Sequence, residues 1–261
     1  MFIYHDQLNR EIVLPYTPKR IISVVPSQTE LLFDLGLSEE IAGITKFCIH
    51  PAGKVKRVTK VGGTKQLDIE RIKSLRPDLI IANKEENECS QVEELMKICP
   101  VWISDICDLQ GAVDMIERVG EIVGKADRAK KMATTITQRF DQLSIGPTGK
   151  RAAYFIWRKP YMVAGKGTFI HSMLQKCGLE NAFTQERYPE VDTEALREAH
   201  PDVIFLSSEP YPYKGKHIDE LKTIVPHSAI KLVDGQFFSW YGSRLLHAPA
   251  YFEQLMNTLN R

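Results

Sequence analysis

Short apolar runs alternate with amphipathic stretches through the first hundred residues. Ile21–Val25 is an apolar, β-branched run typical of a buried parallel strand, and Pro26 ends it. Leucines then recur at helical spacing over 31–35, and Gly36 supplies the residue that ends the helix. The pattern predicts a strand, a tight turn and a helix, and open α/β sheets bind ligands at the carboxyl ends of such strands. An ordinary β-α unit without a ligand fits the same pattern.

The alternation continues along most of the chain. It predicts an N-terminal hairpin from 2–4 and 12–14, strands at 41–45, 79–82, 101–103, 152–157, 162–164, 203–206 and 230–233, and helices at 68–75, 91–99, 169–177, 192–199, 218–224 and 248–259. Strands that alternate with helices indicate parallel sheets with right-handed crossovers.

The longest helical pattern lies in the middle of the chain. Apolar residues recur at three- and four-residue steps from Val113 to Leu143, with a break or a new cap indicated near Gly124. At about 1.5 Å per residue, a helix from Lys125 to Leu143 would be about 28 Å long. That length is enough to span a domain.

Two segments on either side of this helix repeat each other. Leu67–Ile81 and Val191–Phe205 share an acid near the start of a helix and a Pro-Asp pair before a strand, 124 residues apart. The repeat predicts an α/β fold of two Rossmann-like lobes with parallel sheets joined by a single long backbone helix. We place the N-terminal lobe at 1–104, a helical segment with the bridging helix at 105–147, and the C-terminal lobe at 148–261.

Composition narrows the possible functions. Apolar residues make up 43% and charged residues 26% of the 261, and the net charge is +1. This is a globular composition that indicates neither a nucleic acid nor an anionic membrane as partner. No apolar run approaches the roughly 18 residues of a membrane span. The first 18 residues lack the blocks of a secretory signal, which indicates either a cytoplasmic protein or a leader absent from this sequence.

Sequence motifs for catalysis and metal binding are absent. The chain has no GxSxG, HExxH or phosphate-loop motif, and its seven histidines are scattered. Its five cysteines include no CxxC pair, so buried thiols are expected rather than disulfides or zinc ligands. We therefore predict no enzymatic activity, no catalytic residue and no metal site.

Glu70 and Glu194 occupy equivalent positions in the repeat. Each follows a capping aspartate and lies in the first turn of a predicted helix, where the helix dipole stabilises an acid by about 0.3–1 kcal/mol. Alternatively, the two lobes each present one acid to a two-fold symmetric partner with cationic sockets. The sequence leaves both explanations open.

Large aromatic residues gather in predicted loops at strand ends, and two arginines lie among them. The aromatics are Phe47, Trp157, Tyr161, Tyr188, Tyr211, Tyr213, Phe237, Phe238, Trp240 and Tyr241, and the arginines are Arg158 and Arg244. Such a set suits a flat ligand with carboxylate or amide edges, through stacking and forked hydrogen bonds. Single aromatics are more often core residues.

Together these features resemble the substrate-binding proteins of bacterial ABC importers for vitamin B12, haem and ferric siderophores. The resemblance extends from about Arg20 to Leu259. It rests on the segments 20–30, 36–37, 61–63, 68–72 and 77–81 and on their second-lobe counterparts. The family has two Rossmann-like lobes bridged by one rigid helix.

The resemblance implies roles for particular residues. Glu70 and Glu194 match lobe-tip glutamates that pair with arginines of a permease dimer. Tyr188, Trp240 and Arg244 match positions that line the ligand cleft in cobalamin binders. The pattern of loop aromatics adds Phe47, Trp157, Tyr161 and Tyr241 to the predicted ligand-binding residues. Thr64 and Asn83 depart from the pattern, since they stand where a cobalamin binder carries aromatics.

The chain is most similar to the cobalamin-binding branch. The resemblance implies a monomer without an intrinsic cofactor that captures a corrinoid between two lobes and delivers it to an ABC permease. Haem or a ferric siderophore is the alternative ligand, and a cytoplasmic tetrapyrrole or metal-cluster protein is the alternative function. The family implies a periplasmic or cell-surface location, while the missing signal leaves the cytoplasm open.

Overall fold

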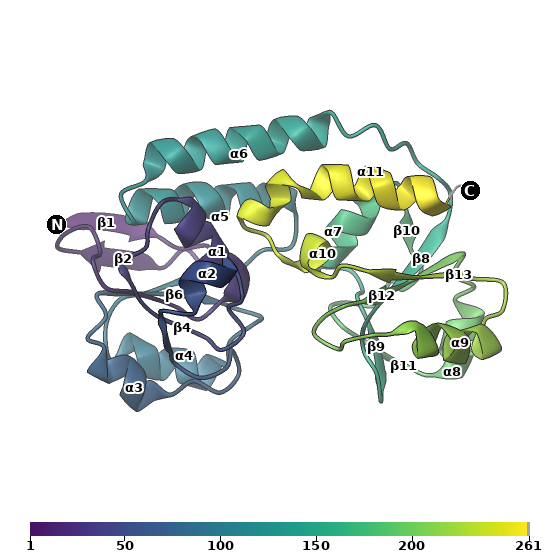
Figure 1. Ribbon diagram of the computed structural model, residues 1–261, viewed down its shortest axis with the longest axis horizontal. Coiled ribbons are helices and arrows are strands. Elements are labelled where there is room, and N and C mark those ends of the chain that lie inside the picture. The colour runs from purple at the N-terminus through teal and green to yellow at the C-terminus, as the bar shows by residue number, and fades with distance from the viewer. Residues whose placement is uncertain (260–261) are drawn as a thin grey trace. The chain divides into compact units, whose positions relative to one another are not determined.

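The computed structural model describes residues 1–259 as two compact α/β units (Figure 1). Unit 1 consists of residues 1–106, 110–137 and 241–244, and unit 2 of residues 107–109, 138–240 and 245 onward. One of the places where the chain passes from unit 1 to unit 2 lies inside helix α6 (Ala126–Asp141). No helix within residues 1–259 is long and apolar enough to cross a membrane.

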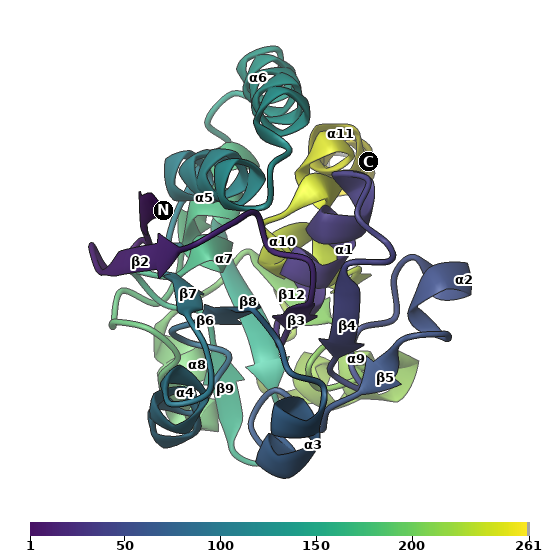
Figure 2. The ribbon, with the colours of Figure 1, turned by 90° about the vertical axis from the view of Figure 1, so that its left-hand side faces the viewer.

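Unit 1 is built on a five-stranded parallel sheet with the order β5-β4-β3-β6-β7. Figure 2 looks at this unit and shows these strands side by side in that order. The strands of the unit are β1 Phe2–His5, β2 Glu11–Leu14, β3 Ile21–Ser23, β4 Ile41–Ile44, β5 Thr59–Lys60, β6 Leu79–Asn83 and β7 Val101–Ser104. The helices are α1 Pro26–Asp34, α2 Ala52–Val55, α3 Ile69–Ser74, α4 Cys89–Met96 and α5 Leu109–Ile122, whose first residue belongs to unit 2.

Unit 2 has a six-stranded mixed sheet with the order β11-β9-β8-β12-β13, in which β10 also pairs with β8. Its strands are β8 Arg151–Trp157, β9 Tyr161–Val163, β10 Glu180–Asn181, β11 Glu190–Val191, β12 Val203–Ser207 and β13 Ala229–Val233. Its helices are α7 Phe169–Lys176, α8 Thr193–Glu198, α9 Gly215–Ile224, α10 Gln236–Ser239 and α11 Ala248–Leu259, and a 3₁₀ turn covers Ser243–Leu246.

The predicted α/β class is confirmed, and the sheet of unit 2 adds an antiparallel edge. Strand β9 pairs antiparallel with β8, and β11 pairs antiparallel with β9. A tight turn joins β8 directly to β9, with Lys159 in the left-handed region at φ 66°. A turn this short permits only an antiparallel return, since a parallel neighbour needs a crossover of a dozen or more residues.

The sequence repeat corresponds to the same aspartate–backbone hydrogen bonding in both units. The Asp78 carboxylate accepts the backbone N–H groups of Lys19 and Arg20, at 2.8 and 2.9 Å, just before strand β3. Asp202 likewise accepts the backbone N–H of Arg151, at 2.7 Å, where β8 begins. Each Pro-Asp pair therefore ties the start of the central strand to the strand beside it.

The apolar runs predicted as strands form the two cores. In unit 1, Ile22, Val24 and Ile80 are fully buried in one cluster, and in unit 2 Ile204 and Leu206 belong to the corresponding cluster. A fully buried aliphatic side chain of this size contributes about 1.5–3 kcal/mol. The sheets are therefore rigid supports for the loops at their ends.

The middle of the chain folds as two helices rather than as one. Helix α5 ends at Ile122 and α6 begins at Ala126, and between them Gly124 has φ 69°, which favours glycine. The helix expected from Lys125 to Leu143 is α6. The predicted N-terminal hairpin is also confirmed, as β1 pairs antiparallel with β2.

Candidate ligand-binding site

The carboxyl ends of the parallel strands are the natural place for a ligand in each unit. In unit 1 this edge is formed by the loops after β3, β4, β6 and β7, and in unit 2 by the loops after β8, β12 and β13. Most of the residues predicted to bind a ligand lie in or near these loops.

A buried polar network underlies the edge of unit 1. Asn83 ends β6, and its amide donates to the Ser104 hydroxyl at 3.0 Å, which also accepts from the Gln28 amide. The Asn83 side-chain oxygen Oδ1 accepts the backbone N–H groups of Glu85 and Glu86, at 2.8 and 3.0 Å. Asn83 therefore shapes the loop after β6 and is itself buried.

Phe47 is the exposed aromatic of this edge. It lies three residues after β4, 52% of its surface is exposed, and the Lys46 ammonium lies 5.2 Å from its ring centroid. A ring in this position is accessible to a flat ligand.

The four residues 241–244 pack entirely into unit 1. Tyr241 is 6% exposed and donates its hydroxyl to Glu86 at 2.7 Å. Ser243 donates to Asp34 at 2.5 Å. A Cβ on Gly242 would lie 2.7 Å from the Ser27 carbonyl oxygen, so only glycine fits there. This segment, predicted as a ligand loop, is thus built into the body of the unit.

Arg244 forms a forked ion pair with Glu30 of α1. Its Nε and Nη2 atoms donate to the two carboxylate oxygens at 3.1 and 2.6 Å, and the side chains are only 15% and 13% exposed. Burial raises the pKa of Glu30, and the charge and hydrogen bond of Arg244 oppose that effect. The guanidinium predicted to hold a ligand is therefore already occupied by a carboxylate of its own chain.

Trp157 is the exposed aromatic at the edge of unit 2. It ends β8 with 42% of its surface exposed, and its ring meets Tyr211 edge-on with centroids 5.8 Å apart. The Tyr213 hydroxyl donates to the Trp157 backbone oxygen at 2.7 Å. These contacts fix the orientation of the indole while leaving part of it accessible.

Arg158 and Tyr161 both bind Glu220 of α9. The Arg158 guanidinium donates to the two carboxylate oxygens at 3.2 and 2.8 Å, and the Tyr161 hydroxyl donates to one of them at 2.5 Å. Hydrogen bonding to Glu220 raises the pKa of Arg158, and hydrogen bonding to Arg158 lowers the pKa of Glu220. Burial, followed by Glu220, raises the pKa of Tyr161 to about 12. At neutral pH Arg158 is therefore protonated, Glu220 is ionised and Tyr161 is neutral.

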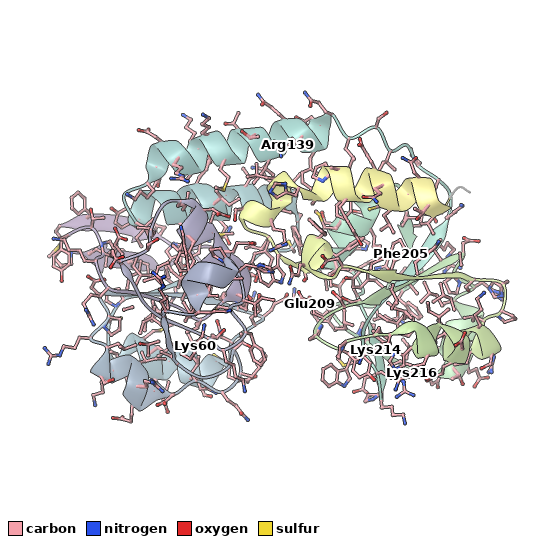
Figure 3. All side chains as sticks on the ribbon, in the orientation of Figure 1. Lys60, Arg139, Phe205, Glu209, Lys214 and Lys216 are labelled. Carbon is pink, nitrogen blue, oxygen red and sulfur yellow. The ribbon has the colours of Figure 1, made fainter. Side chains whose placement is uncertain are left out.

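Trp240 is buried rather than exposed. It is 6% exposed, and its indole N–H donates to Glu209 at 2.6 Å, where the Ser239 hydroxyl also donates at 3.0 Å. Glu209 lies just after β12 and is labelled in Figure 3. Tyr188, in the loop before β11, is half-buried.

Sequence reasoning missed Glu30, Glu86, Glu209 and Glu220 as partners of the predicted ligand residues. These acids lie 214, 155, 31 and 62 residues from the side chains that they bind. No local pattern marks such pairs.

Glu70 and Glu194 are exposed in the first turns of α3 and α8. The preceding aspartates cap these helices, since Asp68 accepts the backbone N–H of Arg71 at 3.0 Å and Asp192 accepts that of Ala195 at 2.8 Å. The helices therefore do not need the two glutamates as caps.

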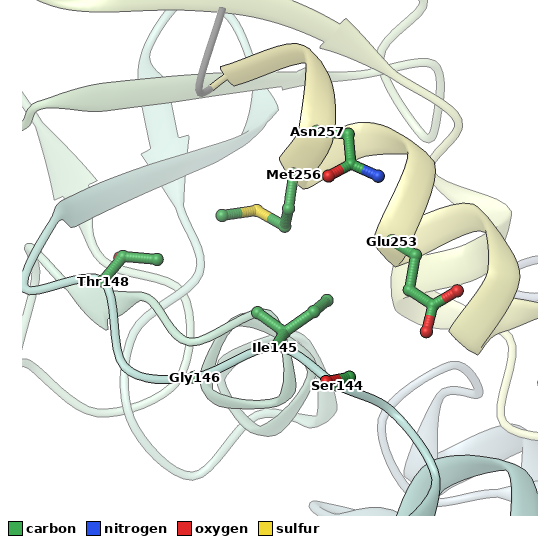
Figure 4. A pocket seen from close by; sticks show the side chains of 7 residues that line it. All are labelled: Ser144, Ile145, Gly146, Thr148, Glu253, Met256 and Asn257. Atoms are coloured by element: carbon green, nitrogen blue, oxygen red, sulfur yellow. The ribbon is translucent and has the colours of Figure 1, made fainter.

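A separate surface pocket of about 330 Å³ lies in unit 2, between the segment after α6 and helix α11 (Figure 4). It is lined by Ser144, Ile145, Gly146, Thr148, Glu253, Met256 and Asn257. None of the predicted ligand residues lines it. Within residues 1–259, no three histidine, cysteine or acidic side chains are grouped to hold a metal ion.

The Glu220 cluster makes stability depend on pH. The folded-state pKa of Glu220 lies below its ordinary value of 4.5, so its ionised form stabilises the fold above pH 4.5 and this contribution is lost as the pH falls through the folded-state value. We expect the stability advantage of the wild type over Glu220→Gln to be constant near neutral pH and to shrink below pH 4.5. Urea denaturation from about pH 7 to about pH 3 measures this. A difference that does not vary with pH would contradict the assignment.

Comparison with known proteins decides the family. The family model described as periplasmic binding protein matches residues 21–224, most of the chain. The chain belongs to the periplasmic binding protein family. Its curated relatives include the vitamin B12-binding protein of Salmonella paratyphi A, which is 26% identical over 201 residues that cover 74% of each chain.

Solved structures of periplasmic binding proteins share the fold. The vitamin B12-binding protein BtuF of Vibrio cholerae has a TM-score of 0.80 at 22% identity, covering 95% of this chain and all of that one. The haem-binding protein BhuT, solved with two haems, has a TM-score of 0.80 at 25% identity, covering 92% of this chain and 99% of that one. The predicted resemblance is confirmed: this periplasmic binding protein belongs with the substrate-binding components of ABC importers.

Proposed function

We propose that this periplasmic binding protein captures a corrinoid, a ligand like vitamin B12, and delivers it to the permease of an ABC importer. The family and the vitamin B12-binding relatives support this role. One observation favours a corrinoid within the family: Arg158, next to Trp157, and Arg244, near Trp240 and Tyr241, each form a bidentate ion pair with a carboxylate of the same chain.

These two bidentate ion pairs limit which class of ligand the arginines can bind. Haem and many siderophores carry carboxylates, which are best held by an arginine in a bidentate pair. Arg158 is engaged by Glu220 and Arg244 by Glu30, so neither offers this pair to a ligand. A corrinoid presents neutral amides at its edge, and these need hydrogen-bond acceptors rather than cations.

The seven predicted ligand residues take two roles in this proposal. Phe47 in unit 1 and Trp157 in unit 2 are each exposed at the carboxyl edge of their own sheet, where each offers stacking surface to a flat ligand, and Tyr188 offers a contact from the loop before β11. The other four do not contact the ligand but hold the surrounding loops in place through hydrogen bonds to glutamates; they are Tyr161, Trp240, Tyr241 and Arg244.

Calorimetric titration with cyanocobalamin, haem and a ferric hydroxamate in parallel tests the ligand. Saturable binding of cyanocobalamin with one site per chain is expected. Haem is the second candidate because of the likeness to BhuT at 25% identity. Binding of haem alone would replace the corrinoid by haem, and binding of none of the three would overturn the proposal.

Replacing Trp157 by alanine should weaken cyanocobalamin binding about tenfold, which corresponds to about 1.4 kcal/mol. The indole supplies exposed stacking surface, and its removal leaves the sheet beneath it intact. Calorimetry on the purified variant measures the loss. Tyr16→Ala is the control, since Tyr16 is 52% exposed but lies in unit 1 outside the predicted site. Equal affinities for the two variants would remove Trp157 from the site.

We also propose that Glu70 and Glu194 dock the protein to a permease dimer from the periplasm or the cell surface, with the protein acting as a monomer. The two glutamates occupy matched positions, one in each unit, and both are exposed. A two-fold partner with one cationic socket per subunit would engage both acids, and such rim charges fix orientation.

A further inference from the structure

Glu220 binds the guanidinium of Arg158, the residue directly after strand β8. Arg158 comes directly after the exposed Trp157, the last residue of β8, so both residues lie at the carboxyl edge of the sheet. Glu220 reaches Arg158 from helix α9, and the two side chains remain 34% and 21% exposed. The ion pair is therefore accessible from solvent beside an aromatic surface, where a ligand carboxylate would otherwise bind.

The geometry of this pair is that of a bound carboxylate. Both carboxylate oxygens accept from the guanidinium, and the Tyr161 hydroxyl adds a third bond at 2.5 Å. The Tyr161 ring packs edge-on against Phe155, with centroids 5.5 Å apart, and this contact fixes its position. Glu220 thus accepts from the Nε and Nη2 atoms of the guanidinium and from the Tyr161 hydroxyl, the donors that a ligand carboxylate would use.

We propose that Glu220 is a specificity-determining residue: it acts as a tethered competitor that closes the Arg158 fork to ligands bearing carboxylates. This inference rests on the proposed function, in that the ligand is taken to lie at this edge of the sheet. A tethered group has an effective concentration in the millimolar range, far above that of a scarce free ligand. A ligand carboxylate that displaced Glu220 would also leave two acids facing one cation, which disfavours that ligand.

The test compares haem, which has two propionates, with its neutral dimethyl ester. The ratio of the two dissociation constants reports the carboxylate contribution alone. In Glu220→Gln, haem should bind about tenfold more tightly than to the wild type, since a charge-assisted bidentate pair becomes available. The dimethyl ester should change by less than about twofold, because it cannot use the fork.

Two variants show whether the gain comes from the fork. Asp219→Asn removes one negative charge from the neighbouring, exposed position of α9 and should leave the haem-to-ester ratio unchanged. The double variant Arg158→Gln with Glu220→Gln should lose the gain. If Glu220→Gln fails to fold, Tyr161→Phe provides the test, since it removes the third bond to Glu220 and should shift the ratio in the same direction by less.

The outcomes separate this inference from the proposed function. An unchanged haem-to-ester ratio in Glu220→Gln, or an equal gain in Asp219→Asn, would overturn the role of Glu220 even if the wild type binds cyanocobalamin. A selective gain for haem in Glu220→Gln would support that role even if cyanocobalamin does not bind, in which case only the corrinoid proposal fails.

Discussion

Replacing Glu70 and Glu194 together by alanine should abolish transport while leaving ligand affinity unchanged. Both side chains are exposed and lie in the first turns of matched helices, α3 and α8. The aspartate caps remain in place, so the helices should keep their structure. Uptake of labelled cyanocobalamin by cells that depend on this protein measures transport, and calorimetry measures affinity.

The control for this prediction removes two other exposed glutamates. Glu94 lies on α4 and Glu198 on α8, so the double alanine variant loses the same charge, one acid from each unit. It should transport like the wild type. A loss of affinity in the Glu70 and Glu194 variant would refute their docking role, as would equal transport by the two double variants.

Replacing Arg244 by alanine should lower the free energy of unfolding by about 3–5 kcal/mol. Glu30 is only 13% exposed, so the variant leaves a largely buried carboxylate without its forked partner. The segment 241–244 also loses one of the three acids that bind it to unit 1. Urea denaturation at neutral pH, followed by circular dichroism, measures the change.

A surface pair with a similar shortest distance provides the comparison. Lys84 and Asp105 approach to 2.5 Å, but their side chains are 51% and 29% exposed. Lys84→Ala should cost less than about 1 kcal/mol, because solvent screens an exposed pair. If Arg244→Ala destabilises no more than Lys84→Ala, the Glu30–Arg244 pair does not hold this segment in place.

Much of the fold could be predicted because its signals are local. A β-branched run such as Ile21–Val25 has few alternatives to a buried strand, and glycine at position 124 permits the backbone that ends α5. The shortest elements were not predicted. Strands β5, β10 and β11 have two residues each, too few to show a period, and their pairing partners determine them.

The candidate site could be predicted only in part. Phe47 and Trp157 are exposed at strand ends, as the pattern of loop aromatics indicates. Trp240 and Tyr241 resemble them in sequence, yet both are 6% exposed and bind glutamates. Exposure depends on which distant segments pack over a loop, and a sequence window contains no information on that.

The sequence by itself determined the two-fold repeat, the α/β alternation and the equivalent positions of Glu70 and Glu194, because these depend on spacing along the chain. Only the tertiary structure decided which charges are neutralised. Arg158 and Arg244 appear in the sequence as available cations, and folding brings to them acids 62 and 214 residues away. Because electrostatic energy depends on distance in space rather than on separation along the chain, the neutralisation of these two arginines arises only in the folded protein.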